Sequence, residues 1–157
     1  NGGSNNLFII DNSGRTTKPY TPFVMVHINT STDRQTTGSK LIIPWDTIHG
    51  RGTSSNVGSH FNTSNSRFVC PVNGFYLVSF MAMTNNSNDT MDIELRKNGS
   101  NANNILVPYQ EATGGSYNQV SGSAIVYCPA NAELRFKLNS GSIYAGRHSN
   151  ITFALFA

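Results

Sequence analysis

Charged residues are scarce in this chain of 157 residues, because Asp, Glu, Lys and Arg together make up only 12% of it. That is about half the usual share for a soluble domain. The formal net charge of +3 comes from few charges of both signs, and the densest cationic pair is Arg96-Lys97. Proteins that bind nucleic acids gather Lys and Arg on one face to contact phosphates. We therefore expect no nucleic-acid partner.

Long apolar runs are also missing. No stretch approaches the roughly 20 residues that a helix needs to span a bilayer, and no signal-peptide core is present, so we expect no membrane insertion. The chain begins with Asn1 rather than Met, and we expect it to be a processed product or a piece of a longer polypeptide. The two cysteines are too few for a disulfide scaffold and too far apart for a zinc knuckle.

Helical periodicity is absent, and an alternation of period two takes its place. In 133–138, charged residues alternate with large apolar ones, and 91–97 shows the same pattern. This alternation predicts strands with one wet face, on which Glu94 and Glu133 would lie. Short strands without helices indicate a sandwich or barrel. Four further runs are apolar on both faces and are expected to be covered on both sides, by the opposite sheet and by another subunit: 23–28, 75–80, 125–128 and 151–156.

Turn signals separate these runs. Asn73-Gly74 and Asn98-Gly99 are each typical of a type I′ turn, since both residue types tolerate positive φ. We expect residues 1–20 to form a linker or lead-in segment and residues 21–157 to form one domain. Four polar stretches are predicted to be loops: Asn29 to Lys40, Arg51 to His60, Thr84 to Asp89 and Ala112 to Asn118.

Residue patterns for catalysis or metal binding are weak. The four histidines lack a short ligand spacing, and Asp46, Asp89 and Asp92 stand outside any dense acidic loop that would favour calcium. No Gly-x-Ser-x-Gly motif is present, and the eight acidic residues provide no supported pair for glycoside hydrolysis. We expect no catalytic residue, no metal and no cofactor.

Residues 68–80, FVCPVNGFYLVSF, resemble the signature of the globular C1q head. That signature has Phe, five residues and Gly, followed by aromatics at alternate positions. Here Phe68, Gly74, Tyr76 and Phe80 match it, and Val78 takes one aromatic place. Further resemblances cover most of the chain: Asn56 and Phe61 at the expected spacing before Phe68, Phe23 to Ile28 as the first strand, Glu94 to Gly99 as a hairpin, and Thr152 to Ala157 as the closing strand.

The chain departs from the C1q pattern at two places. Gly50 stands where the family usually has an aromatic six positions before the Asn, and we expect Trp45 to fill that role. Ala154 replaces a small Gly that is common in the last strand. Neither departure changes the predicted fold, although the first leaves the shape of the loop after Gly50 open.

The resemblance implies an all-β, ten-strand jelly-roll sandwich of the C1q/TNF type that assembles as a homotrimer. It also implies recognition of proteins, glycans or lipids through loops, without enzymatic activity. The alternating and doubly apolar runs, together with this resemblance, predict two sets of residues. The core set is Phe61, Phe68, Trp45, Leu134 and Phe136. The set expected in the core or at the three-fold interface is Tyr76, Phe80, Tyr127, Phe153 and Phe156.

In jelly-roll topology, the turns after Cys70 and Cys128 lie at the same end of the sandwich. We therefore expect the two thiols to be neighbours. A disulfide requires Cα atoms within about 7 Å. The sequence leaves two states open, namely a Cys70–Cys128 disulfide and a pair of free buried thiols.

Two functions are compatible with this resemblance. C1q-like heads also occur in virion proteins of bacteriophages, especially those of marine cyanobacteria, and residues 11–20, leading into Phe23, are similar to that branch. We expect a virion protein, either a tail-fibre head or a capsid decoration protein. The alternative is a secreted, extracellular recognition module of the lectin or innate-immune type. The chain upstream of Asn1 would distinguish them.

Recognition is expected in the polar loops, because Tyr and Arg are favoured anchors and short amides and hydroxyls form adaptable hydrogen bonds. The expected partners, besides the chain itself, are other virion proteins or a protein or glycan of the host surface. A second interpretation is that these loops only keep a weakly charged surface soluble. The candidate recognition residues are Arg34, Arg51, His60, Tyr117 and Arg147.

Overall fold

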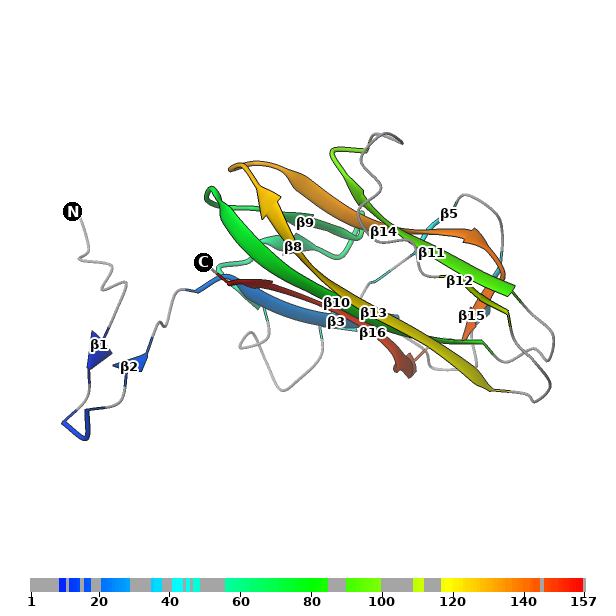
Figure 1. Ribbon diagram of the computed structural model, residues 1–157, viewed down its shortest axis with the longest axis horizontal. Coiled ribbons are helices and arrows are strands. Elements are labelled where there is room, and N and C mark those ends of the chain that lie inside the picture. The colour runs from blue at the N-terminus through cyan, green and yellow to red at the C-terminus, as the bar shows by residue number, and fades with distance from the viewer. Residues whose placement is uncertain are drawn as a thin grey trace.

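The computed structural model describes residues 9–10, 12–14, 16–17, 21–28, 35–37, 41–43, 45, 47–48, 56–84, 90–99, 109–111, 117–144 and 146–156. Every regular element among them is a strand (Figure 1). In this part of the chain, no helix is long and apolar enough to cross a membrane. The strands are β1 (Ile9–Ile10), β2 (Thr16–Thr17), β3 (Phe23–Ile28), β4 (Gln35–Thr37), β5 (Leu41–Ile42), β6 (Thr47–Ile48), β7 (Asn56–Val57), β8 (Phe61–Asn62), β9 (Arg67–Val69), β10 (Gly74–Thr84), β11 (Thr90–Lys97), β12 (Tyr109–Glu111), β13 (Asn118–Cys128), β14 (Glu133–Ser140), β15 (Ser142–Tyr144) and β16 (Gly146–Leu155).

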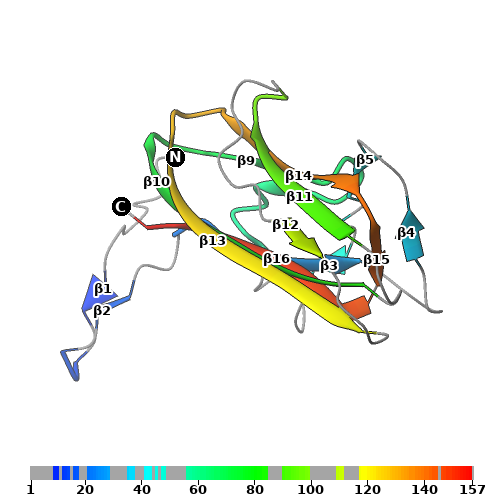
Figure 2. The same ribbon diagram turned by 45° about the vertical axis from the view of Figure 1, so that its right-hand side comes forward.

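Two antiparallel sheets form the sandwich, and both views show them as two layers (Figures 1 and 2). Sheet I has the order β4-β15-β10-β16-β3-β6, with β13 paired to β10 and β7 paired to β3. Sheet II has the order β12-β11-β14-β9-β8, with β5 paired to β14. The predicted all-β sandwich is confirmed. Several strands are only two or three residues long, so the count of ten strands stays a prediction.

Aromatic rings from both sheets meet in the middle of the sandwich. Phe153 of β16 stacks on Phe68 of β9, with ring centroids 4.9 Å apart and planes 7° apart. Phe61 of β8 and Phe136 of β14 pack against the same Phe153 ring at 6.2 and 5.9 Å. All four side chains are buried, as are Trp45 and Leu134. Phe153 therefore contacts all three of these sheet II rings, and Tyr76 and Phe80 of β10 add contacts to Phe68 and Phe136 at 5.8 and 5.3 Å.

Strand β10 supplies the inward face that the C1q-like signature describes. Gly74, Tyr76, Val78 and Phe80 alternate inward and are buried. The Tyr76 hydroxyl donates a hydrogen bond of 2.8 Å to the carbonyl of Val72, which holds the bend before the strand. Burial raises the pKa of this hydroxyl above its ordinary value. The tyrosine of the signature thus packs in the core and ties down the chain that enters β10.

One of the two predicted type I′ turns is confirmed and the other is wrong. Asn98 and Gly99 both have positive φ, at 56° and 69°. Neither Asn73 nor Gly74 has positive φ, because Gly74 already pairs with Cys128 as the first residue of β10. The Asn73 side chain instead accepts a hydrogen bond of 2.8 Å from the Ala130 N–H. Pairing with β13 therefore fixes this bend.

Three polar segments carry strands that composition did not predict. The expected loop at 29–40 contains β4, which pairs with β15, and the expected loop at 51–60 contains β7, which pairs with β3. The expected lead-in at 1–20 contains the β1–β2 hairpin, which stands apart from the sandwich in both views (Figures 1 and 2). Thr is a good strand former. Pairing with a neighbouring strand also provides hydrogen-bond partners for the backbone N–H and C=O groups of these short segments.

Asn56 explains the spacing of Asn and Phe in the signature. Its side-chain amide donates to the carbonyl of Phe61 at 3.1 Å, and its side-chain oxygen accepts from the Phe61 N–H at 3.2 Å. Both hydrogen bonds span five residues, so the side chain closes the turn between β7 and β8. An Asn five positions before Phe61 therefore fixes the entry of that ring into the core.

Trp45 has no exposed surface. Its backbone N–H donates to the carbonyl of Ile43 at 2.9 Å, and its backbone carbonyl accepts a hydrogen bond of 3.2 Å from the Ser66 hydroxyl. Ile43 in turn donates to the carbonyl of Phe136 on β14. These bonds hold the indole in the sandwich, as expected for a replacement of the missing aromatic. Pro44 and Gly50 lie outside the described residues.

The Trp45→Ala variant should lower the free energy of unfolding by about 3–5 kcal/mol, because it leaves a cavity the size of a buried indole. Trp45 is the only tryptophan, so the wild-type fluorescence should show the blue-shifted emission of a buried indole. Trp45→Phe, which keeps most of the volume, should be milder. A wild-type emission maximum typical of water exposure would contradict the burial.

Candidate self-association and recognition surfaces

The outward face of sheet I exposes large apolar side chains at one end. Residues at odd positions of β10 face outward, and the register places Phe75 opposite Tyr127 and Leu77 opposite Ile125 on β13. The rings of Phe75 and Tyr127 contact edge to face with centroids 5.5 Å apart. Six side chains at this end are between 37% and 64% exposed, and we call them the apolar patch: Val72, Phe75, Leu77, Ile125, Tyr127 and Phe156.

The apolar patch is confined to one end of the sheet. The Phe156 N–H donates to the Phe75 carbonyl at 2.7 Å, which brings the C-terminal strand to the patch. Further along the same face, Ser79 lies between Ser123 on β13 and Thr152 on β16, and Thr152 pairs with Met25 on β3. In this region the outward face carries hydroxyl groups and half-buried methionines such as Met25 and Met81, in place of the exposed aromatic and aliphatic side chains of the patch.

The five residues predicted for the core or the three-fold interface divide between these two locations. Tyr76, Phe80 and Phe153 are buried inside the sandwich, whereas Tyr127 and Phe156 are exposed in the apolar patch. The sequence prediction missed Phe75, Leu77 and Ile125. The doubly apolar runs at 75–80 and 125–128 contained the signal, but the prediction took only one residue of each alternating pair.

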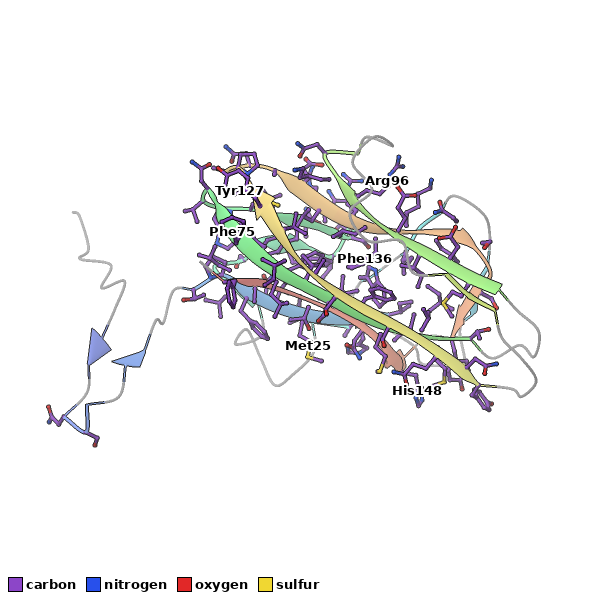
Figure 3. The ribbon with its side chains drawn as sticks, in the orientation of Figure 1. Met25, Phe75, Arg96, Tyr127, Phe136 and His148 are labelled. Atoms are coloured by element: carbon purple, nitrogen blue, oxygen red, sulfur yellow. The ribbon has the colours of Figure 1, made fainter. Side chains whose placement is uncertain are left out.

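A second aromatic group lies at the opposite end of the outward face. The rings of Tyr117 and Tyr144 have centroids 5.6 Å apart, and those of Tyr144 and His148 lie 5.3 Å apart. Tyr117 is 63% exposed, and His148 is exposed as well. We call these three side chains the tyrosine–histidine cluster. Figure 3 shows His148 far from Phe75 and Tyr127, so the two groups mark opposite ends of the sandwich.

The predicted recognition residues have different positions. Tyr117 is exposed, as a contact residue requires. His60 is only half-buried and packs edge-on against Phe68, with centroids 6.5 Å apart, and burial lowers its pKa. Its ring also covers Gly58, where a Cβ would collide with the imidazole. His60 therefore contributes to packing. Arg34 and Arg51 and the side chain of Arg147 lie outside the described residues.

The outward face of sheet II carries ion pairs. Glu133 pairs with Arg67 and, at 3.2 Å, with Arg135. Glu94 pairs with Arg96 at 3.0 Å and accepts a hydrogen bond of 3.0 Å from Asn139. The prediction that Glu94 is solvent-exposed is wrong, because its exposed fraction is only 4%. Its hydrogen-bond and ion-pair partners compensate the cost of burying its charge. Both of these carboxylates are thus paired with neighbouring cations.

The two cysteines are neighbours and are both free thiols in this structure. Both side chains are fully buried, and the thiols are hydrogen-bonded to each other. Of the two states that the sequence left open, the structure therefore has the free buried pair. The contact raises the pKa of Cys70 and lowers that of Cys128.

The described residues contain no group of three or more His, Cys, Asp or Glu side chains that could hold a metal ion. Of the calcium donors considered above, Asp92 is half-buried on β11. Asp46 and Asp89 lie outside the described residues.

Similarities to known proteins agree with this architecture. The globular domain of a zebrafish complement 1qA protein superposes with a TM-score of 0.66 at 15% identity, covering 87% of this chain and 98% of that one. Eiger TNF from S. frugiperda gives 0.63 at 19% identity, covering 87% and 94%. Murine APRIL gives 0.61 at 11% identity, covering 87% and 99%. At such identities the likeness shows the fold alone.

None of the curated proteins is significantly similar to this chain in sequence. The C1q domain, in contrast, matches residues 24–156. This match contains the core aromatics, the apolar patch and the tyrosine–histidine cluster. The chain belongs to the C1q domain family.

Proposed function

We propose that this chain is the non-enzymatic, trimeric head of a virion protein, which contacts a host surface or capsid. The apolar patch is the observation that carries this proposal. Large contiguous apolar patches are rare on monomeric proteins and mark interaction sites. C1q and TNF domains are generally binding modules, and the resemblance to the family implies a homotrimer. Burial between three copies would remove the patch from water.

The apolar patch is the surface that we expect to form the contact between subunits. Phe75, Leu77, Ile125 and Tyr127 lie on two adjacent, fully paired strands, so they form a rigid surface. A three-fold contact joins this surface to a different part of the next copy, and three such contacts close a ring. Beyond Ser79 the outward positions of β10 are the half-buried Met81 and Met83, which pair with the exposed Ser121 and Gln119 of β13. The exposed large apolar side chains of sheet I are thus densest at the patch end, and we assign self-association to that end.

The tyrosine–histidine cluster supports recognition at the opposite end. Tyrosine side chains are preferred anchors in binding surfaces, because a rigid ring gives contact area at low entropic cost. Exposed Gln119 and Ser121 continue the strand that follows Tyr117 and supply amide and hydroxyl groups. This combination suits a glycan or a polar protein surface of a host or capsid.

The virion context rests on the resemblance of residues 11–20 to the phage branch of the family. Tail-fibre heads and capsid decoration proteins both need a stable trimer and differ in what the distal loops contact. The secreted recognition module remains the alternative. Mass spectrometry of purified virus particles from the source of this sequence decides between them. Peptides of this chain should be present in the particles, and their presence only among secreted proteins would contradict a virion role.

The Tyr117→Ala variant tests recognition. We expect labelled protein carrying it to lose at least about tenfold of its affinity for intact host cells or purified capsids, the loss typical of a hot-spot residue. Its oligomeric mass and Tm should stay close to those of the wild type. Ser64→Ala, at an exposed position between β8 and β9, is the matched control. Unchanged binding of Tyr117→Ala to both targets would place recognition elsewhere or rule it out.

A further inference from the structure

Cys70 and Cys128 come from different sheets and meet at the end of the sandwich that carries the apolar patch. Cys70 directly follows β9 of sheet II, and Cys128 is the last residue of β13 in sheet I. The Cys70 N–H donates to the carbonyl of Ala132 at 2.9 Å, and its carbonyl accepts from the Asn131 N–H at 2.7 Å. Both peptide groups of Cys70 are thus bonded to the turn that follows Cys128, and this holds the two residues in register.

The contact between the two side chains is direct. Neither has exposed surface, and the thiols are hydrogen-bonded to each other. This hydrogen bond lowers the pKa of Cys128 and raises that of Cys70, and nearby Lys97 further favours the Cys128 thiolate. The Lys97 ammonium lies at the same corner, 3.5 Å from the carbonyl of Tyr127. Because the Lys97 ammonium lies beside the residue that precedes Cys128, we assign the first attack to Cys128.

We propose that Cys70 and Cys128 are a reversible dithiol–disulfide couple that joins the two sheets beside the apolar patch. The two residues are 58 positions apart in the sequence (70 to 128), so the bond would close a long loop. Cross-links over long loops restrict the unfolded chain most. The oxidised form should therefore be the more stable one.

The oxidation is written with a small-molecule disulfide such as oxidised glutathione as the electron acceptor. The Cys128 thiolate attacks one sulfur of this disulfide, forming a mixed disulfide and releasing one glutathione thiolate. The Cys70 sulfur then attacks Cys128 Sγ, which forms the Cys70–Cys128 bond and releases the second glutathione. The Cys70 proton passes to a leaving thiolate. The two protein thiols are oxidised, and one glutathione disulfide is reduced to two thiols.

Access to the pair requires local opening, because both thiols are fully buried. The covering segment is the turn 129–132, whose first three residues are exposed. Breaking its two hydrogen bonds to Cys70 would release the turn without unfolding β10 or β14. Oxidation should therefore be slow in the native state and fast during refolding.

The consequence for assembly rests on the proposed function. Val72 lies two residues after Cys70, and Tyr127 directly precedes Cys128. The disulfide would therefore restrict the movement of these two patch residues relative to each other. An oxidised trimer should then exchange subunits more slowly than a reduced one.

The test is refolding of the full chain with and without oxidised glutathione, followed by alkylation and intact-mass measurement. We expect oxidised protein to lose the mass of two hydrogens, to retain no alkylatable thiol and to show a Tm higher by roughly 5–15 °C. Dithiothreitol should reverse each change. Two alkylatable thiols after oxidative refolding, a disulfide between chains, or loss of the circular dichroism of the native fold on oxidation would each overturn the proposal.

Single variants test the roles of the two sulfurs. Cys70→Ser should trap one glutathione on Cys128, whereas Cys128→Ser should react more slowly, and equal reaction of both would overturn the assigned order. Peptide mapping of the oxidised wild type locates the bond even if a variant fails to fold. Subunit exchange is measured separately, by mixing labelled and unlabelled trimers. A confirmed bond without slower exchange would contradict only the effect on assembly.

Discussion

Replacing Phe153 with alanine should lower the free energy of unfolding by about 3–5 kcal/mol. Phe153 is fully buried and contacts three other rings, Phe61, Phe68 and Phe136, across the two sheets. Among the described residues, Phe153 is the one ring of sheet I that contacts all three of these rings, and its removal leaves a cavity between the sheets. Such stacked pairs contribute about 0.5–1.5 kcal/mol each beyond buried area. Chemical denaturation at fixed protein concentration measures the loss.

Tyr117→Ala is the matched comparison, because it removes another aromatic ring from an exposed position. Its effect on the free energy of unfolding should stay below about 1 kcal/mol. If Phe153→Ala were no more destabilising than Tyr117→Ala, the aromatic cluster would not be the link between the sheets.

Replacing Leu77 with lysine should convert the proposed trimer into folded monomers. Leu77 lies at the centre of the apolar patch, opposite Ile125 on one side and Ala154 on the other. Burying an unpaired ammonium in an apolar interface costs several kcal/mol per chain. Each trimer would contain three such ammonium groups, so the cost would be incurred three times. In a single chain the side chain faces solvent, so the sandwich should keep its strand content. Sedimentation velocity and circular dichroism measure both effects.

Val69→Lys provides the control for added charge. Val69 is half-buried on β9 and pairs with Glu133 on sheet II, so a lysine there gains a neighbouring carboxylate. This variant should remain a trimer. Dissociation of both variants would indicate that net charge, and not the patch, controls association, and a trimeric Leu77→Lys variant would place the interface elsewhere.

Much of the fold could be predicted from the sequence, because period-two alternation and the aromatic signature report directly on inward-facing positions. Tyr76, Val78 and Phe80 face inward as the signature implies, and Trp45 is buried as a replacement aromatic. Short polar strands escaped prediction, since β4 and β7 gain their pairing only from distant segments. Gly74 escaped for the same reason: its backbone conformation depends on Cys128, which lies far away in the sequence.

The candidate surfaces were harder to predict. A run that is apolar on both faces shows that both faces are covered, but it does not say which residues face the core. For this reason Phe75 and Leu77 were missed while Tyr76 and Phe80 were assigned to the interface or core. Glu94 was misplaced because alternation cannot reveal that Arg96 and Asn139 compensate its burial. The proximity of Cys70 and Cys128 followed from topology, whereas their hydrogen bond required coordinates.

The molar mass of the purified wild-type chain in solution tests the central claim most directly. Light scattering coupled to size-exclusion chromatography at micromolar concentration should give about 51 kDa, the mass of three chains of 17.1 kDa. The value should not fall on moderate dilution, because a buried apolar interface dissociates only weakly. A stable species of 17.1 kDa at the same concentration would contradict the trimer and, with it, the role assigned to the apolar patch.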